Sequence, residues 1–161
     1  MQQPLLLVDH LDIQLISVQA QIRSRKKLLQ EMARLLTLPL DSKIKEKDIY
    51  HSLLEREKLG NTGIGNGVAL PHSRSATTKR PIVAIITLEQ AIDYDSIDRQ
   101  PVDIAFGLLV PQDASQEHLN LLSEIARMVS KEDIKSQLAN ASTATELIKL
   151  IMHYSVQQSQ N

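Results

Sequence analysis

The chain has no cysteine and no tryptophan, and its aromatic rings are limited to one phenylalanine and three tyrosines. Without cysteine it forms no disulfide framework and uses no thiol nucleophile, which is compatible with the reducing cytoplasm where we expect the protein to reside. With so few aromatic rings it lacks the stacking platforms with which proteins hold single-stranded nucleic acid. The functional chemistry must therefore come from other side chains.

An excess of charge and a long apolar run are also missing. Lys and Arg number 18, Asp and Glu number 19, and the formal net charge is −1. This balance gives no electrostatic reason to expect nucleic acid or an acidic membrane surface as a partner. No apolar run approaches the ~18 residues needed to cross a bilayer, so we expect no membrane insertion. The short apolar start has no basic residues before it, so we expect no signal peptide.

Glycine is scarce too, with five residues, but four of the five lie between Gly60 and Gly67. Glycine tolerates positive φ and lets other groups approach the backbone, so this cluster predicts a shaped loop with several free N–H groups. The apolar run 68–70 follows and is long enough for a strand. Pro71 should end that strand or place it at a sheet edge. His72 should then lie at the strand end, beside the glycine loop.

Two familiar nucleotide-binding patterns do not fit this stretch. The Walker loop requires a lysine after its glycines, and the dinucleotide fingerprint has another glycine spacing and precedes a helix. What remains is an imidazole presented beside an anion-friendly loop. Histidine is partly neutral at pH 7 and can act there as a covalent nucleophile. On spacing alone, a histidine that merely packs beside a tight turn is an equally good interpretation of His72.

The stretch from Arg56 to His72 resembles the active-site signature of the fructose/mannitol-type enzyme IIA domains of the phosphoenolpyruvate-dependent phosphotransferase system. The shared pattern is Arg-Glu-Lys-x-Gly-x-Thr-Gly-Ile-Gly-Asn-Gly-x-Ala-x-Pro-His. It is most similar to the nitrogen-regulatory branch, and the resemblance extends from about Leu11 to Tyr154. The family usually has a small residue, most often glycine, after the histidine. Here Ser73 takes that place, which affects the geometry on one side of His72.

The resemblance implies a phosphoryl carrier, in which His72 accepts phosphate from an HPr-like phosphocarrier of the nitrogen branch. Arg56 would stabilise the phosphate, because its planar guanidinium offers several donors. A second histidine of the family matches His118, which would orient the nucleophile or bond the phosphoryl group. The residue pattern alone favours His118 as a first-turn cap or a solvent-facing residue. The implied phosphate loop comprises Thr62, Gly63, Gly65, Asn66, Gly67 and Ser73.

The resemblance also implies the output and the partners. The nitrogen-regulatory branch points to regulation of nitrogen, potassium or carbon metabolism, through partners such as potassium-transport regulators or sensor kinases. The main alternative is a fructose/mannitol-type sugar-transport enzyme IIA that passes phosphate to the IIB domain of a membrane permease. We expect no cofactor and no metal, because a phosphohistidine donor is already activated. A metal hydrolase built on His72 and His118 would need a third ligand that we cannot identify. A binding module without activity would not need the intact set of Arg56, His72 and His118.

Apolar periodicity predicts an α/β domain with a sheet covered on both faces. The resemblance implies more, a three-layer α/β/α sandwich with a mixed central sheet, like the mannitol-type enzyme IIA. We predict one domain over residues 1–161, with a core from about 11 to 154 and a polar, frayed tail from 155 to 161. Strands are predicted at 15–20, 68–70, 82–88 and 102–110, and helices at about 24–36, 45–59, 115–129, 131–138 and 143–152.

The ends of these elements carry recognisable signals. Ser24 and Ser115 are candidate N-caps, and Thr143 with Glu146 forms a candidate capping box. Gly60 should end the second helix, whose last turn brings Arg56 to the glycine loop. Residues 73–80 are predicted to be a polar loop. Residues 91–100, which contain several aspartates, are predicted to be a turn-rich loop rather than a calcium site.

Overall fold

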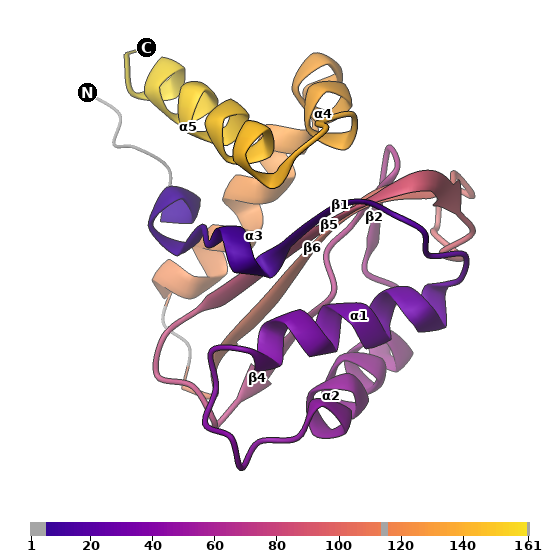
Figure 1. Cartoon of the computed structure of the whole chain (residues 1–161), viewed down its shortest axis with the longest axis vertical. Coiled ribbons are helices and arrows are strands. Elements are labelled where there is room, and N and C mark those ends of the chain that lie inside the picture. The colour runs from indigo at the N-terminus through magenta and orange to yellow at the C-terminus, as the bar shows by residue number, and fades with distance from the viewer. Residues whose placement is uncertain (1–5, 114–115, 161) are drawn as a thin grey trace.

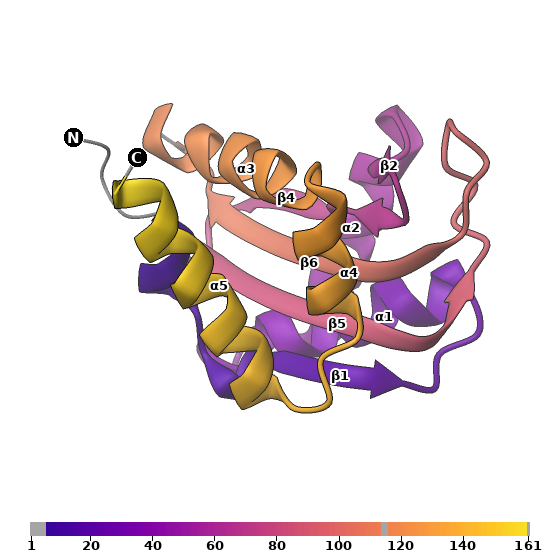
Figure 2. The ribbon, with the colours of Figure 1, turned by 90° about the horizontal axis from the view of Figure 1, so that it is seen from above.

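The computed structural model describes residues 6–113 and 116–160, and the side chains of Glu117 and His118 lie outside that description. Its strands form a mixed sheet between two layers of helices (Figures 1 and 2). One face carries α1 (Arg25–Thr37) and α2 (Glu46–Leu59), and the other carries α3 (Gln116–Val129), α4 (Glu132–Ala139) and α5 (Ala144–Gln160). The predicted three-layer α/β/α sandwich is confirmed.

The described strands form one six-stranded sheet, in which five follow the order β1-β5-β6-β3-β2. The sixth, β4, pairs with the same edge of β6 as β3 does, but farther along that strand. Antiparallel pairing joins β5 to β6, whereas β1 runs parallel to β5, and both β3 and β4 run parallel to β6. The strands are β1 (Ile16–Ala20), β2 (Gly63–Gly65), β3 (Val68–Ala69), β4 (His72–Ser75), β5 (Ile82–Ile92) and β6 (Val102–Pro111).

The apolar core consists of two clusters, one on each face of the sheet. Along β5, Val83 and Ile85 enter the cluster under α3 and α5, while Ala84 and Ile86 enter the cluster under α1 and α2. Successive side chains of a strand point to opposite faces, so a strand buried on both faces needs a continuous apolar run. This explains why residues 82–88 read as one uninterrupted hydrophobic segment.

The signals at the helix ends are largely confirmed. Ser24 accepts a hydrogen bond from the N–H of Lys27 at 3.2 Å and caps α1. At the start of α5, the Thr143 hydroxyl accepts from the N–H of Glu146, whose carboxylate accepts from the N–H of Ser142. Gly60 ends α2 as predicted, but with φ 162° its backbone is extended and not left-handed. The predicted cap at residue 115 lies outside the described residues.

Three boundaries differ from the prediction. The tail expected to fray continues as α5 to Gln160, because Tyr154 and Ser155 are buried against the sheet layer. The polar loop expected at 73–80 begins as strand β4, which hydrogen-bonds to β6. The loop expected at 91–100 starts later, since β5 continues to Ile92 and Tyr94 is buried beyond it.

Candidate active site

His72 lies at an interruption in a strand. The chain pairs with β6 through Ala69, opposite Ala105, and resumes with His72, opposite Leu108, so the register is kept across the gap. Pro71 has no N–H to give to a ladder, and its carbonyl accepts from the N–H of Leu108 at 3.0 Å. His72 therefore begins strand β4, which corrects the expectation that it follows the end of a strand.

The His72 ring is fixed by a neighbour in its own segment. Its Nδ1 lies 2.7 Å from the carbonyl oxygen of Leu70 and donates to it, which leaves Nε2 without a proton on the neutral ring. Burial lowers the pKa of His72 below 6.5, and the charge of Arg56 lowers it further. The bond to Leu70 and the nearby Glu57 act in the opposite direction. The balance favours a neutral imidazole at pH 7.

An open pocket of about 670 Å³ adjoins this ring. It spans the gap between the last turns of α2 and the beginning of α3, and much of its wall is apolar. Leu59, at the end of α2, lines the pocket and is 86% exposed. The pocket is lined by Ser52, Glu55, Arg56, Leu59, His72, Ser73, Arg74, Leu108, Val110, Leu119 and Leu122.

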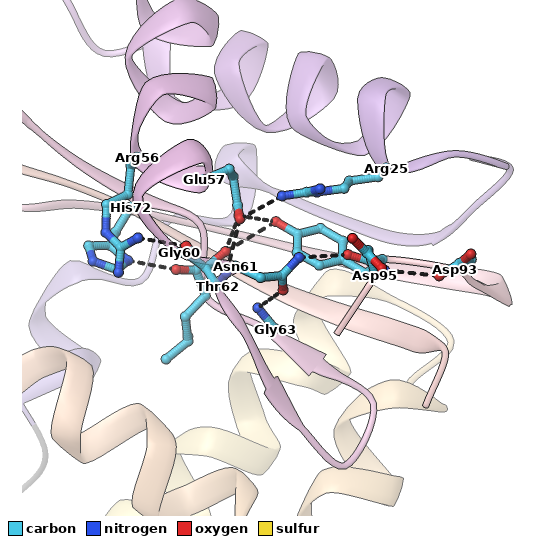
Figure 3. A network of polar contacts seen from close by, with 12 residues as sticks. Arg25, Arg56, Glu57, Gly60, Asn61, Thr62, Gly63, His72, Asp93 and Asp95 are labelled. Carbon is cyan, nitrogen blue, oxygen red and sulfur yellow. Dashed lines mark hydrogen bonds and ion pairs between the residues drawn. The ribbon is translucent and has the colours of Figure 1, made fainter. Parts of the chain in front are cut away.

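Arg56 reaches the site as the sequence predicts. It lies in the last turn of α2, where its Nη1 donates to the carbonyl oxygen of Gly60 at 2.7 Å. Figure 3 shows its guanidinium next to the ring of His72. Arg56 thus places a cation close enough to the imidazole to lower the pKa of His72.

The glycine cluster forms a β-hairpin rather than an open loop. Strands β2 and β3 pair through a turn at residues 65–67, where φ is 93°, 57° and 80°. The N–H of Gly63 donates to the Asn61 side chain at 2.7 Å, and the N–H of Asn66 donates to Asp98 at 3.0 Å. The expected supply of free N–H groups is therefore wrong for Gly63 and Asn66. The hairpin also runs away from His72 (Figure 3).

The glycines serve the packing of this hairpin. A Cβ at Gly63 would overlap the side chain of Ser96, and a Cβ at Gly67 would lie 2.8 Å from the Nζ of Lys135. Ser96 belongs to the loop after β5, and Lys135 lies on α4 and pairs with Asp103 at 2.7 Å. The hairpin is thus held between elements that are distant in the sequence. Periodicity could not predict this, because it describes only local structure.

A buried carboxylate near the site was given no role by the sequence analysis. Glu57 follows Arg56 on α2, and its side chain is 1% exposed. Its oxygens accept from Arg25 at 2.9 Å, from the N–H of Thr62 at 2.9 Å, and from the hydroxyls of Thr62 and Tyr94 (Figure 3). One signal could have revealed it. Glu57 continues, four residues after Leu53, the stripe of α2 that faces the core.

Two residues of the predicted site remain, Ser73 and His118. The Ser73 side chain is buried, and its hydroxyl shares a hydrogen bond with the hydroxyl of Ser52 on α2. His118 falls in the first turn of α3, and its side chain lies outside the description, so its role stays a prediction.

A comparison with family models matches residues 9–154 to the family described as "Phosphoenolpyruvate-dependent sugar phosphotransferase system, EIIA 2". The match covers most of the chain, and the chain therefore belongs to this family. The family resemblance found in the stretch from Arg56 to His72 is confirmed. Among residues 6–113 and 116–160, no helix combines the length and the apolar character that crossing a membrane requires.

Individual relatives narrow the likeness. A nitrogen regulatory protein of Pseudomonas aeruginosa is 40% identical over 129 residues, which cover 80% of this chain and 83% of that protein. The crystal structure of nitrogen regulatory protein IIA-Ntr from Neisseria meningitidis superposes with a TM-score of 0.84 at 36% identity, covering 91% of this chain and 99% of that chain. The crystal structure of IIA mannitol from Escherichia coli has a TM-score of 0.72 at 15% identity, covering 88% and 98%, and shares the fold.

Proposed function

We propose that this chain is a phosphoryl carrier in which Nε2 of His72 takes phosphate from a phosphohistidine on an HPr-like phosphocarrier. The observation that carries the proposal is the state of the ring. Burial lowers the pKa of the ring, its Nδ1 donates to the carbonyl of Leu70 so that Nε2 is bare on the neutral ring, and the guanidinium of Arg56 lies beside it. A histidine that merely packed at a strand end would not need an adjoining open pocket.

The transfer is balanced without a cofactor. The lone pair of Nε2 forms the new N–P bond, the donor's N–P bond breaks, and its electron pair returns to the donor ring. The His72 ring then carries a positive charge, which the Leu70 carbonyl stabilises through the Nδ1 proton. In such transfers the protein mainly positions groups and neutralises charge on the transferred oxygens. In this proposal the guanidinium of Arg56 supplies the neutralising positive charge, and His118 adds a hydrogen bond to the phosphoryl group or orients His72.

The glycine stretch has a supporting role in this proposal. Thr62, Gly63, Gly65, Asn66 and Gly67 build the hairpin that leads into the segment carrying His72. Ser73 fastens that segment to α2 through Ser52. These residues shape the site, since the N–H groups of Gly63 and Asn66 are already bonded within the protein.

We propose that the output is regulatory, in nitrogen, potassium or carbon metabolism. The likeness to nitrogen regulatory proteins supports this, at 40% identity for the Pseudomonas aeruginosa protein. A phosphorylated His72 would bring about two negative charges to a surface that now carries Arg56 and Arg74. A target such as a potassium-transport regulator or a sensor kinase could then distinguish the bare form from the phosphorylated form.

Sugar transport is the second candidate, because the family's own description names a sugar phosphotransferase system. The same site would pass phosphate to the IIB domain of a permease.

The test of the carrier is incubation with phosphoenolpyruvate, enzyme I and the phosphocarrier, followed by intact-mass measurement. We expect one acid-labile phosphate on the parent chain and none on His72→Ala. Arg56→Ala should still be labelled, but on the order of 10²–10³ times more slowly, because a charge-stabilising donor is lost. Full labelling of folded His72→Ala would contradict the proposed nucleophile.

The test of the regulatory output compares proteins retained from cell extract by the bare form, the phosphorylated form and His72→Asp. A coupling of ~1–3 kcal/mol would change the affinity of a target ~5–150-fold. Equal retention by all three forms would remove the switch. Rapid passage of phosphate to a permease domain, with no target that distinguishes the forms, would favour sugar transport.

A further inference from the structure

Glu57 is a carboxylate buried where the fold alone gives little reason to bury one. Its side chain is 1% exposed, and it occupies a position on the core-facing stripe of α2 where an apolar residue would be expected. Burying a charge is costly unless it is paired and hydrogen-bonded. Here the carboxylate accepts from four donors: the guanidinium of Arg25, the N–H and the hydroxyl of Thr62, and the hydroxyl of Tyr94.

These partners come from three separate parts of the chain. Arg25 opens α1, Tyr94 lies in the loop after β5, and Thr62 precedes β2. Arg25 also stacks over the ring of Tyr94 at 5.0 Å. Burial, followed by the charge of Glu57, raises the pKa of Tyr94 above its usual value, so the phenol keeps its proton and remains a donor. Glu57 is thus held in one place from several sides.

A continuous path of hydrogen bonds leads from this carboxylate to the nucleophile. Glu57 accepts from the N–H of Thr62, and the carbonyl of Thr62 accepts from the N–H of Leu70 at 2.9 Å. The carbonyl of Leu70 then accepts from Nδ1 of His72 at 2.7 Å. Figure 3 shows Glu57, Thr62 and His72 near one another at the end of α2. Each link is short, and each involves the backbone of the segment that follows the helix.

We propose that Glu57 is a positioning residue that sets the tautomer and the orientation of His72 through Thr62 and Leu70. It holds Thr62 in place, Thr62 holds Leu70, and the Leu70 carbonyl keeps the proton on Nδ1. Nε2 is therefore left bare toward incoming phosphate. This role rests on the proposed function only in that His72 is the acceptor.

Two variants at position 57 separate the place of the side-chain oxygen that accepts from Thr62 from the negative charge of the carboxylate. Glu57→Gln keeps an oxygen that can accept from the N–H of Thr62 while it removes the charge. Glu57→Asp keeps the charge but is shorter by one methylene and cannot reach Thr62 from the same backbone. We expect Glu57→Gln to behave like the parent and Glu57→Asp to be impaired. Glu31→Asp, at the surface pair with Arg34 on α1, is the matched control for the same substitution in a helix.

The primary measurement is nitrogen-15 NMR of the His72 ring in the unphosphorylated protein. The parent and Glu57→Gln should show mainly the Nδ1–H tautomer, whereas Glu57→Asp should show a mixture of both tautomers. The rate of phosphoryl acceptance by Glu57→Asp should fall on the order of 10–100-fold, the range typical of groups that orient histidine ligands at metal sites. Glu31→Asp should match the parent in both measurements.

The direction of the pKa change excludes a simple loosening of the site. The charged groups that face His72 are Arg56 and Glu57 from α2, with Glu55 and Arg74 at the pocket. Losing the Leu70 bond in Glu57→Asp lowers the pKa of His72, because that bond raises it. Merely opening the site to water would raise the pKa toward 6.5, because burial is the main cause of the lowering.

The proposal is overturned if Glu57→Asp keeps the parent's tautomer, or if Glu57→Gln is the impaired variant, since the charge would then act directly. If Glu57→Asp does not fold, a Glu57→Gln spectrum with mixed tautomers overturns the proposal, and a parent-like one supports it. The ring spectra need no donor protein. A chain that never accepts phosphate would therefore refute the proposed function and still leave the role of Glu57 decided.

Discussion

A histidine accepts a phosphoryl group when its ring is neutral and one ring nitrogen carries a free lone pair. In this chain the surroundings of His72 favour both conditions. Burial and Arg56 lower the pKa of His72, and a backbone carbonyl holds the proton on Nδ1. The proposed acceptance of phosphate by His72 therefore requires no general base.

This arrangement predicts the pH dependence of phosphoryl acceptance. In the proposed transfer the neutral ring is the nucleophile, and the pKa of His72 is lowered below 6.5. The rate should therefore be constant from about pH 8 down past the ordinary histidine value and should fall only at lower pH. Arg56→Ala should move the midpoint upward, because Arg56 lowers the pKa. Rates measured from about pH 5 to 8 with one donor preparation test both statements. A midpoint above 6.5 in the parent would contradict them.

The lowered pKa of His72 also makes the free energy of unfolding depend on pH. The unfolded chain binds a proton at His72 near pH 6.5, whereas the folded chain binds it only at lower pH. The unfolded state is therefore favoured as the pH falls from 6.5 through the lowered pKa. The contribution of neutral His72 to the stability of the folded state is therefore fully present above pH 6.5 and is lost as the pH falls through the lowered pKa.

At the scale of elements, the site depends on contacts between α2 and the segment that carries His72. Ser52 on α2 and Ser73 on β4, which follows His72 in the chain, share a hydrogen bond. Comparison with the family suggests that glycine at position 73 would be harmless. The structure indicates instead that glycine would leave Ser52 without this partner and would free the backbone of β4.

Ser73→Gly should therefore lower the free energy of unfolding by roughly 1–2 kcal/mol, from the lost hydrogen bond and the added backbone freedom. The rate of phosphoryl acceptance should fall less than in Arg56→Ala, because neither hydroxyl is assigned to the transfer and only the attachment of β4 to α2 is weakened. Urea denaturation of Ser73→Gly, Ser52→Ala and the double variant measures the coupling. Additive losses would show that the two hydroxyls do not stabilise each other.

The elements also show what could be predicted from the sequence and what could not. The helices, the buried strands and the approach of Arg56 follow from periodicity, caps and adjacency, because each depends on local structure. The bonds of Asn66 to Asp98 and of Glu57 to Arg25 join segments about thirty residues apart. No local pattern contains them. His72 is singled out as the proposed acceptor because its surrounding signature is long and unusual, although spacing alone left a packed histidine equally acceptable.

At the scale of the whole molecule, one sheet serves two cores. Ile85 faces the cluster under α3 and α5, and Ile86 faces the cluster under α1 and α2, yet both lie on β5 and both are 0% exposed. Since the two layers share this strand, we expect them to unfold together. Damage on one face should be felt on the other.

Ile85→Ala and Ile86→Ala should each lower the free energy of unfolding by roughly 2–5 kcal/mol, the usual cost of removing a buried aliphatic side chain. Both variants should unfold in a single transition when followed by circular dichroism and by the resonances of His72. Ile97→Ala is the control, because this side chain is 86% exposed. Separate transitions for the two layers would contradict the shared core.

The interrupted strand also determines where the chain tolerates changes in length. His72 stays in register with β6 because residues 69 and 72 keep a constant offset across Pro71. One residue inserted between Gly67 and His72 would turn the imidazole to the opposite face of the sheet, toward the wrong layer of helices. Insertions at 76–81, between β4 and β5, would leave that register unchanged. Relatives of this chain should therefore vary in length after the histidine far more freely than before it.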